Sequence, residues 1–129
     1  MRISPSCYAA TGLAYSAPWS VNAGIAAGKD ITLVVDTGSN ALSAATLHGY
    51  AECARPGNSI RVINTEKHFD HIGGNSYFSR HDAEIWGHAG IRRTEDEFRA
   101  EIEEFNQAVT NPARRAAGEA RVFFAGTEL

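Results

Sequence analysis

The chain has 129 residues, 43% of them hydrophobic, which is enough to bury the core of one ordinary domain. Fifteen acidic against 12 basic residues give a formal net charge of −3, which argues against a nucleic-acid partner or an anionic membrane surface. No apolar run approaches the length of a membrane span and the first residues lack the apolar stretch of a signal peptide, so we expect a cytoplasmic protein without a membrane partner.

The first part of the chain predicts strands. Residues 6–15 have the pattern of a first strand or hairpin arm, with Gly12 as a break, and residues 16–20 are expected to be irregular around Pro18. An apolar run at 21–27, a turn at 28–30 and a β-branched run at 31–35 predict a two-stranded hairpin. The second strand is nearly continuous in apolar residues, as expected of a strand covered on both faces.

A carboxylate, Asp36, ends this strand and opens the sequence Asp-Thr-Gly-Ser. Two roles are open to it. It can hydrogen-bond loop amides or the second nitrogen of a metal-binding histidine, or it can cap the next helix. Asp-Thr-Gly also occurs in aspartic proteases, where two aspartates act together, but the sequence holds no second copy of the motif.

Residues 40–54 have helical spacing, and Pro56-Gly57 ends the helix. The side chains predicted to share its packed face are those of Leu42, Thr46, Tyr50 and Cys53. His48 lies off that face and is expected in solvent. Cys53, half-buried on this helix, and Cys7 lack a paired spacing and are expected to be free thiols. A strand at 60–63 follows, so residues 31–63 predict a strand–helix–strand unit with parallel pairing.

Directly after this strand, four candidate metal ligands occur within six residues: Glu66, His68, Asp70 and His71. Imidazole and carboxylate are ligands that zinc accepts. On an extended backbone Glu66, His68 and Asp70 would share one side and His71 would point elsewhere, so Glu66 with His68 and Asp70 with His71 could serve two neighbouring ions. The alternative is an exposed polar loop in which two histidines fall together by chance.

Two glycines, Gly73 and Gly74, remove side chains where this loop must turn back and start a helix. That helix is expected from 75 to about 80, burying Tyr77 and Phe78, with His81 on the surface. Residues 83–86 predict a third parallel strand. His88 comes just beyond it, where packing or a backbone hydrogen bond is a more natural role than contact with a metal site.

The last part of the chain predicts helices and a strand. Thr94 and Glu97 have capping-box spacing and begin a helix that extends to 109. Its apolar stripe is Phe98, Ile102, Phe105 and Val109. Glu101, Glu103 and Glu104 are expected on a solvated face. Residues 112–120 predict a short helix and residues 121–125 a further strand.

The loop at 64–75 resembles the metallo-β-lactamase superfamily of metal-dependent hydrolases, whose signature is a His-x-His-x-Asp-His loop after a strand. The matching positions are Asn64, Thr65, His68, Asp70, His71, Gly73, Gly74 and Asn75. Glu66 replaces the first histidine of the signature. Val-Val-Asp-Thr-Gly at 34–38 matches a second family element, whose aspartate, here Asp36, neighbours the metal loop. A histidine like His88 is common in the family and is not normally a ligand.

The resemblance implies an α/β fold that is half of a four-layer αββα sandwich, with a mixed sheet flanked by helices. Family members are roughly twice this length, so residues 1–129 are expected to form a single domain that is the N-terminal portion of the family domain. The uncovered face of the sheet should then be apolar. A missing C-terminal half, or another copy in a homo-oligomer, would complete the site.

The resemblance also implies a hydrolase with one or two Zn²⁺ ions held by Glu66, His68, Asp70 and His71, in which Asp70 also orients the nucleophile as a catalytic group. Because Glu66 makes the site richer in oxygen, Mn²⁺ or iron are open as well. The substrate would be a small molecule with an ester, thioester, lactone, lactam or phosphoester group. The alternative is a non-catalytic metal-binding or interaction module, or a half-domain that needs a partner chain.

Overall fold

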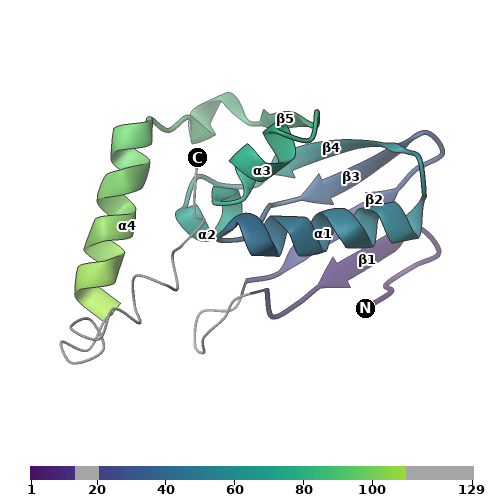
Figure 1. The fold of residues 1–129 in the computed structure, drawn as a ribbon, viewed down its shortest axis with the longest axis horizontal. Coiled ribbons are helices and arrows are strands. Elements are labelled where there is room, and N and C mark those ends of the chain that lie inside the picture. The colour runs from purple at the N-terminus through teal and green to yellow at the C-terminus, as the bar shows by residue number, and fades with distance from the viewer. Residues whose placement is uncertain (14–20, 110–129) are drawn as a thin grey trace.

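The computed structural model describes residues 1–13 and 21–109, in which five strands form one mixed sheet in chain order (Figure 1). The strands are β1 (Cys7–Ala10), β2 (Ala23–Ala27), β3 (Ile31–Val35), β4 (Ser59–Asn64) and β5 (Glu84–Gly87). The first three pair antiparallel, and β3, β4 and β5 pair parallel. The predicted hairpin and the three parallel strands are thereby confirmed, whereas the helix and strand expected after residue 111 lie outside the described residues.

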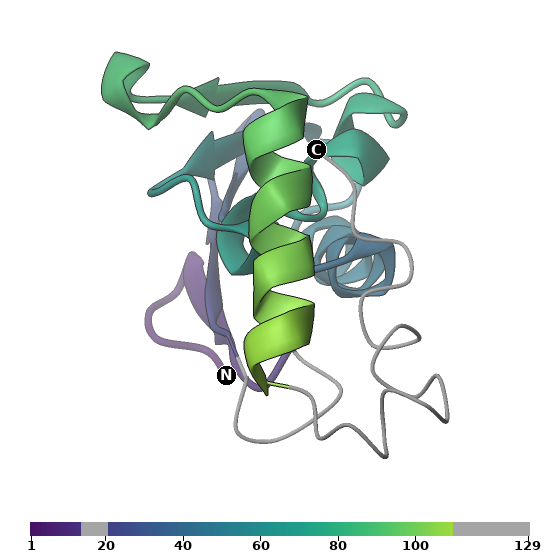
Figure 2. The ribbon, with the colours of Figure 1, turned by 90° about the vertical axis from the view of Figure 1, so that its left-hand side faces the viewer.

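Helices cover one face of this sheet. The helical segments are α1 (Ala41–Ala54), α2 (Phe69–Ile72), α3 (Asn75–Ser79), the 3₁₀ turn η1 (Ala89–Ile91) and α4 (Glu95–Val109). Helices α1 and α3 pack on the sheet, while α4 stands apart from that layer, beside α2 (Figures 1 and 2). The one-turn helix α2 lies inside the candidate metal loop and was not predicted. None of the helices within the described ranges has the length and apolar content that a membrane span requires.

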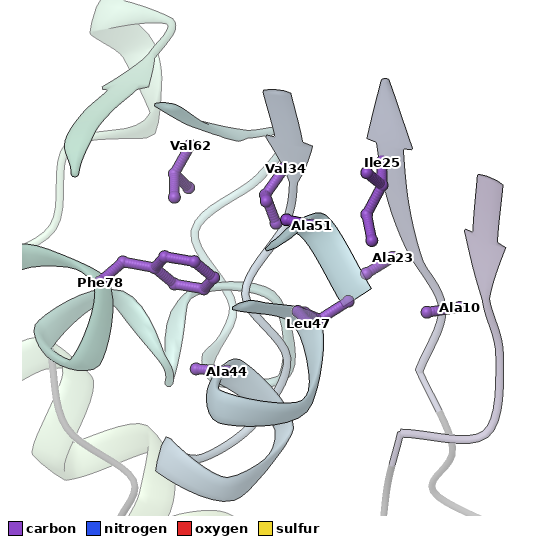
Figure 3. Close-up of a cluster of buried hydrophobic side chains, with 9 residues drawn as sticks. All are labelled: Ala10, Ala23, Ile25, Val34, Ala44, Leu47, Ala51, Val62 and Phe78. Carbon is purple, nitrogen blue, oxygen red and sulfur yellow. The ribbon is translucent and has the colours of Figure 1, made fainter. Parts of the chain in front are cut away.

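The main core lies between the sheet and α1 (Figure 3). Val34 and Val62 come from neighbouring parallel strands and meet Leu47 of α1 and Phe78 of α3, and all four side chains are fully buried. The parallel register places Val34 opposite Val62, so the two valines form one continuous surface for the helices. This packing fixes the position of the loops that leave the carboxyl ends of β3 and β4.

The predicted packed face of α1 is wrong. Leu42 is 57% exposed and Tyr50 is 54% exposed, and Cys53 is exposed rather than half-buried. The residues of α1 that are buried instead are Ser43, Ala44, Leu47 and Ala51. Both sets have helical spacing, so periodicity alone does not choose between them. The small side chains of the observed face allow α1 to approach the sheet closely, which the long side chains of the predicted face would prevent.

The surroundings of His48 differ from a second prediction. His48 is half-buried rather than solvated, and its Nδ1 lies 3.2 Å from the hydroxyl of Tyr77. His81 is exposed, as expected, and its ring stacks on that of Tyr77 with a centroid separation of 4.1 Å. Cys7 and Cys53 are free thiols, as predicted.

The face of the sheet opposite α1 carries apolar side chains that are only partly covered. Leu33 and Ile63 are half-buried, and Trp86 is 54% exposed. On the same face Arg61 forms an ion pair with Glu84 at 2.8 Å and lies 5.2 Å from the centroid of the Trp86 ring. The expectation of an apolar face therefore holds for Leu33, Ile63 and Trp86, while Arg61 of β4 and Glu84 of β5 add charge.

Candidate metal centre

Two loops meet where the neighbouring parallel strands β3 and β4 end, the place at which sites are usually built in open α/β sheets. Thr37, from the loop after β3, is fully buried. Its N–H donates to the carbonyl of His71 at 2.8 Å, and its hydroxyl accepts from the N–H of Gly74 at 3.2 Å. The loop after β3 therefore holds the backbone of the candidate metal loop in place.

The two glycines of the loop are required by space. A Cβ on Gly74 would lie 2.6 Å from both the Cβ of Ala44 and the carbonyl oxygen of Thr37, and one on Gly73 would lie 2.6 Å from the carbonyl carbon of Ser39. Their φ angles, −63° for Gly73 and −99° for Gly74, are ordinary. Close approach between the metal loop and the β3 loop, rather than an unusual backbone conformation, therefore explains the pair.

Asp36 links the β3 loop to the metal loop through its carboxylate. Oδ1 accepts from the N–H of Thr65 at 2.8 Å, and Oδ2 lies 2.7 Å from Oγ1 of Thr65 and 2.9 Å from Nδ1 of His71. The alternative role as a helix cap is wrong, because Asn40 caps α1 by accepting from the N–H of Ser43 at 2.9 Å. Asp36 adopts a φ of +63°, which aspartate tolerates better than most residues.

The other nitrogen of His71 faces carboxylates. Nε2 lies 3.1 Å from Oε1 of Glu66 and 3.7 Å from Oδ2 of Asp70. The second oxygen of Glu66 contacts Nδ1 of His68. Glu66 therefore meets both histidines, and the expected division into two separate pairs is not observed, because the chain turns into α2 after His68.

These contacts shift two pKa values. The hydrogen bond with His68 is the main cause that lowers the pKa of Glu66, and the charges of both histidines act in the same direction, against its burial. Burial alone would lower the pKa of His71. The hydrogen bond with Asp36 and the negative charges of Asp70, Asp36 and Glu66 outweigh it and raise the pKa of His71.

The donor set suits a divalent cation. Nδ1 of His71 lies against the carboxylate of Asp36 and Nε2 faces Glu66 and Asp70, which is the arrangement in which a carboxylate orients a metal-binding histidine. Two imidazoles and two carboxylates match the ligand preference of zinc, with manganese and iron also compatible. Among the described residues, no three histidine, cysteine, aspartate or glutamate side chains lie together in a geometry that could hold a metal ion, so the contacts in this loop join the side chains two at a time.

His88 does not join this cluster. Its Nδ1 accepts from the N–H of Gly90 at 3.0 Å and so caps η1, which is the local backbone role that its position favoured. His88 is exposed and, like Glu66, lines a groove of about 410 Å³.

Glu101 is the residue that sequence reasoning missed. It was expected in solvent, but its side chain is 23% exposed and its Oε2 accepts from the N–H of Phe69 at 3.0 Å. Its position three residues after the buried Phe98, beside the apolar stripe of α4, is the signal that could have found it.

The sequence matches the profile of one protein family. The sequence profile of the metallo-β-lactamase superfamily matches residues 16–124. Among curated proteins, none matches the sequence significantly.

Several solved structures share the fold. A metallo-β-lactamase from Hirschia baltica is 21% identical, with a TM-score of 0.56 over 81% of this chain and 46% of that one. The metallo-β-lactamase FIM-1 from Pseudomonas aeruginosa, solved in a mono-zinc form, is 18% identical, with a TM-score of 0.60 over 70% of this chain and 41% of that one. A metallo-β-lactamase from Erythrobacter litoralis is 16% identical, with a TM-score of 0.60 and the same coverages, 70% and 41%. The chain thus spans under half the length of these structures.

Proposed function

We propose that this chain, which belongs to the metallo-β-lactamase superfamily, provides the first metal-binding loop of a metal-dependent hydrolase. The observation that carries the proposal is the placement of His71, with Nδ1 at 2.9 Å from Asp36 and Nε2 facing Glu66 and Asp70. A histidine held by one buried carboxylate and facing two others matches the way in which metal-binding histidines are usually oriented, and favours this role over that of a solvated polar loop.

The proposed ligands are Glu66, His68, Asp70 and His71, holding one or two divalent ions, with Zn²⁺ preferred and Mn²⁺ or iron as alternatives. A bound ion of this kind lowers the pKa of a coordinated water and so supplies a nucleophile near neutral pH. The proposed substrate is a small molecule with an ester, thioester, lactone, lactam or phosphoester group.

The residues of the chain have distinct parts in this proposal. Asp36 fixes the ring and the tautomer of His71 through Nδ1. Asp70 is the proposed group that orients the attacking nucleophile, since its carboxylate is 36% exposed and lies 3.7 Å from Nε2 of His71. Gly73 and Gly74 keep the loop close enough to Asp36 for the hydrogen bond to His71 to form.

The test is hydrolysis of chromogenic ester, thioester, lactone, lactam and phosphoester substrates by the protein in its full natural length, with and without added Zn²⁺ or Mn²⁺. We expect metal-dependent turnover of one class that is lost in His68→Ala and in Asp70→Ala, both of which must keep the wild-type circular dichroism spectrum. Turnover that survives both substitutions would exclude this site. Metal binding without any turnover would favour the non-catalytic module.

A further inference from the structure

The two backbone groups on either side of His68 are held by a single ion pair. The carbonyl of Lys67 accepts from Nη1 of Arg93 at 2.7 Å, and the N–H of Phe69 donates to Oε2 of Glu101 at 3.0 Å. The same two atoms, Nη1 of Arg93 and Oε2 of Glu101, pair with each other at 2.5 Å. One short chain of contacts therefore spans the backbone of His68 from the residue before it to the residue after it.

The loop has a local need for these contacts. His68 occupies the N-cap position of α2, but its side chain makes no cap hydrogen bond and turns to Glu66 instead. The first N–H groups of a helix have no partner within the helix, and that of Phe69 is one of them. Glu101 supplies the missing acceptor and leaves the imidazole of His68 available for another role.

The pair is more protected than an ordinary surface ion pair. The side chains of Arg93 and Glu101 are 10% and 23% exposed, whereas those of Arg99 and Glu95, which pair on the same helix, are 73% and 63% exposed. Protected pairs are screened less by salt and hold their geometry better. The guanidinium of Arg93 also lies 5.7 Å from the centroid of the Phe98 ring.

Apolar contacts hold α4 in the position that this pairing needs. Phe98 of α4 is 3% exposed and packs with Phe69 and Ile72 of α2, which are 6% and 5% exposed, and Ile102 joins the same cluster. This cluster is separate from the main core beneath α1. Helix α4 stands outside the helical layer on the sheet, against the metal loop (Figure 2).

We propose that Arg93 and Glu101 are positioning residues, which fix the backbone of His68 so that its imidazole is held toward Glu66 and the metal. The inference rests on the proposed function. In this role Glu101 connects α4 to the metal loop and restrains the backbone of that loop. His68 needs this support because its side chain is 56% exposed, whereas the imidazole of His71 is 23% exposed and already held by Asp36.

The experiment compares Glu101→Ala with Glu95→Ala, which breaks the exposed ion pair on the same helix without touching the metal loop. Zn²⁺ affinity is measured by competition with a chelator. The coordination of the metal is followed in the visible spectrum of the Co²⁺-loaded protein. The protection of the Phe69 amide is measured by hydrogen exchange in the metal-free protein. For Glu101→Ala we expect a Zn²⁺ Kd raised about 10- to 100-fold, the range for residues that support metal ligands. We also expect an altered Co²⁺ spectrum and faster exchange at Phe69.

Glu101→Gln should recover most of the affinity, because its amide oxygen can still accept from the N–H of Phe69. Glu95→Ala should bind Zn²⁺ like the wild type. Where Glu101→Ala does not fold, Arg93→Lys replaces it, since one ammonium cannot reproduce the planar set of donors that reaches Lys67, Glu97 and Glu101. The same loss of affinity and change of spectrum are then expected.

Wild-type Zn²⁺ affinity and unchanged Phe69 exchange in Glu101→Ala would overturn the inference, as would an equal loss of affinity in Glu95→Ala. Failure of the proposed function gives a different result, because the wild-type chain would then bind no metal. Hydrogen exchange at Phe69 in metal-free Glu101→Ala would still report whether Glu101 restrains the loop.

Discussion

Oδ2 of Asp36, at the end of β3, lies 2.9 Å from Nδ1 of His71 in α2, and the carboxylate of Asp36 is 8% exposed. This contact joins the two loops that leave neighbouring parallel strands. It orients the ring of His71 so that Nε2 is the nitrogen presented to Glu66 and Asp70. The placement of His71 in the proposed metal site depends on it.

Asp36→Asn should therefore weaken metal binding while leaving the fold intact. Asparagine tolerates the φ of +63° at this position and its amide oxygen can still accept from the N–H of Thr65. It lacks the second acceptor oxygen that His71 uses. We expect the Zn²⁺ Kd to rise about 10- to 100-fold in a chelator competition. An unchanged Kd in the folded variant would show that Asp36 does not control His71.

Gly74→Ala should destabilise the protein because the added methyl group would lie 2.6 Å from the Cβ of Ala44. Overpacking of this kind costs about 1–3 kcal/mol in the free energy of unfolding, measured by urea denaturation. Gly49→Ala in α1 is the matched control, since a Cβ there meets nothing within 4 Å. That change should stabilise the helix by up to about 1 kcal/mol. Equal effects of the two substitutions would refute the close approach at Gly74.

Two leucines of α1 distinguish its buried face from its exposed face. Leu47 is fully buried under the sheet, so Leu47→Ala should lower the free energy of unfolding by about 2–5 kcal/mol. Leu42 is 57% exposed, and Leu42→Ala should change it by less than about 0.5 kcal/mol. Denaturant unfolding of both variants measures the difference. A larger loss of unfolding free energy in Leu42→Ala than in Leu47→Ala would show that the face predicted from the sequence is the packed one.

The start of α4 should contribute stability that depends on pH. The backbone N–H and the hydroxyl of Thr94 both donate to the carboxylate of Glu97, and these bonds lower its pKa below the ordinary value of 4.5. A lowered folded-state pKa means that the contribution is present above the unfolded value and is lost as pH falls through the folded value. Thermal unfolding of the wild type and Glu97→Gln should differ at neutral pH and converge in acid. An equal difference in unfolding temperature between the two proteins at neutral and at acid pH would be inconsistent with this capping contact.

Local signals in the sequence were sufficient for much of the fold. The β-branched run at 31–35 and its turn gave the hairpin, and the Thr94–Glu97 spacing gave the start of α4, because each depends on residues close together in the chain. The position of Asp36 next to the metal loop followed from the parallel pairing of β3 with β4.

Other features depend on contacts that no local pattern contains. Two stripes of α1 have helical spacing, and only the closeness of the sheet selects the one with Ala44 and Ala51. Helix α2 is a single turn, too short for a periodic signal, yet it redirects the chain so that Glu66 meets both His68 and His71. Glu101 accepts from the N–H of Phe69, which lies 32 residues earlier in the chain.

The central claim is that the loop between β4 and α3 binds a divalent metal ion through His71 and its neighbours. Calorimetric titration of Zn²⁺ into the metal-stripped protein tests this most directly, with His71→Ala beside the wild type and His81→Ala, a change at an exposed histidine, as the control. We expect saturable Zn²⁺ binding by the wild type and by His81→Ala, and loss of binding in His71→Ala. A folded wild-type protein that takes up no Zn²⁺, or a His71→Ala variant that binds it equally well, would show that this loop is not a metal site.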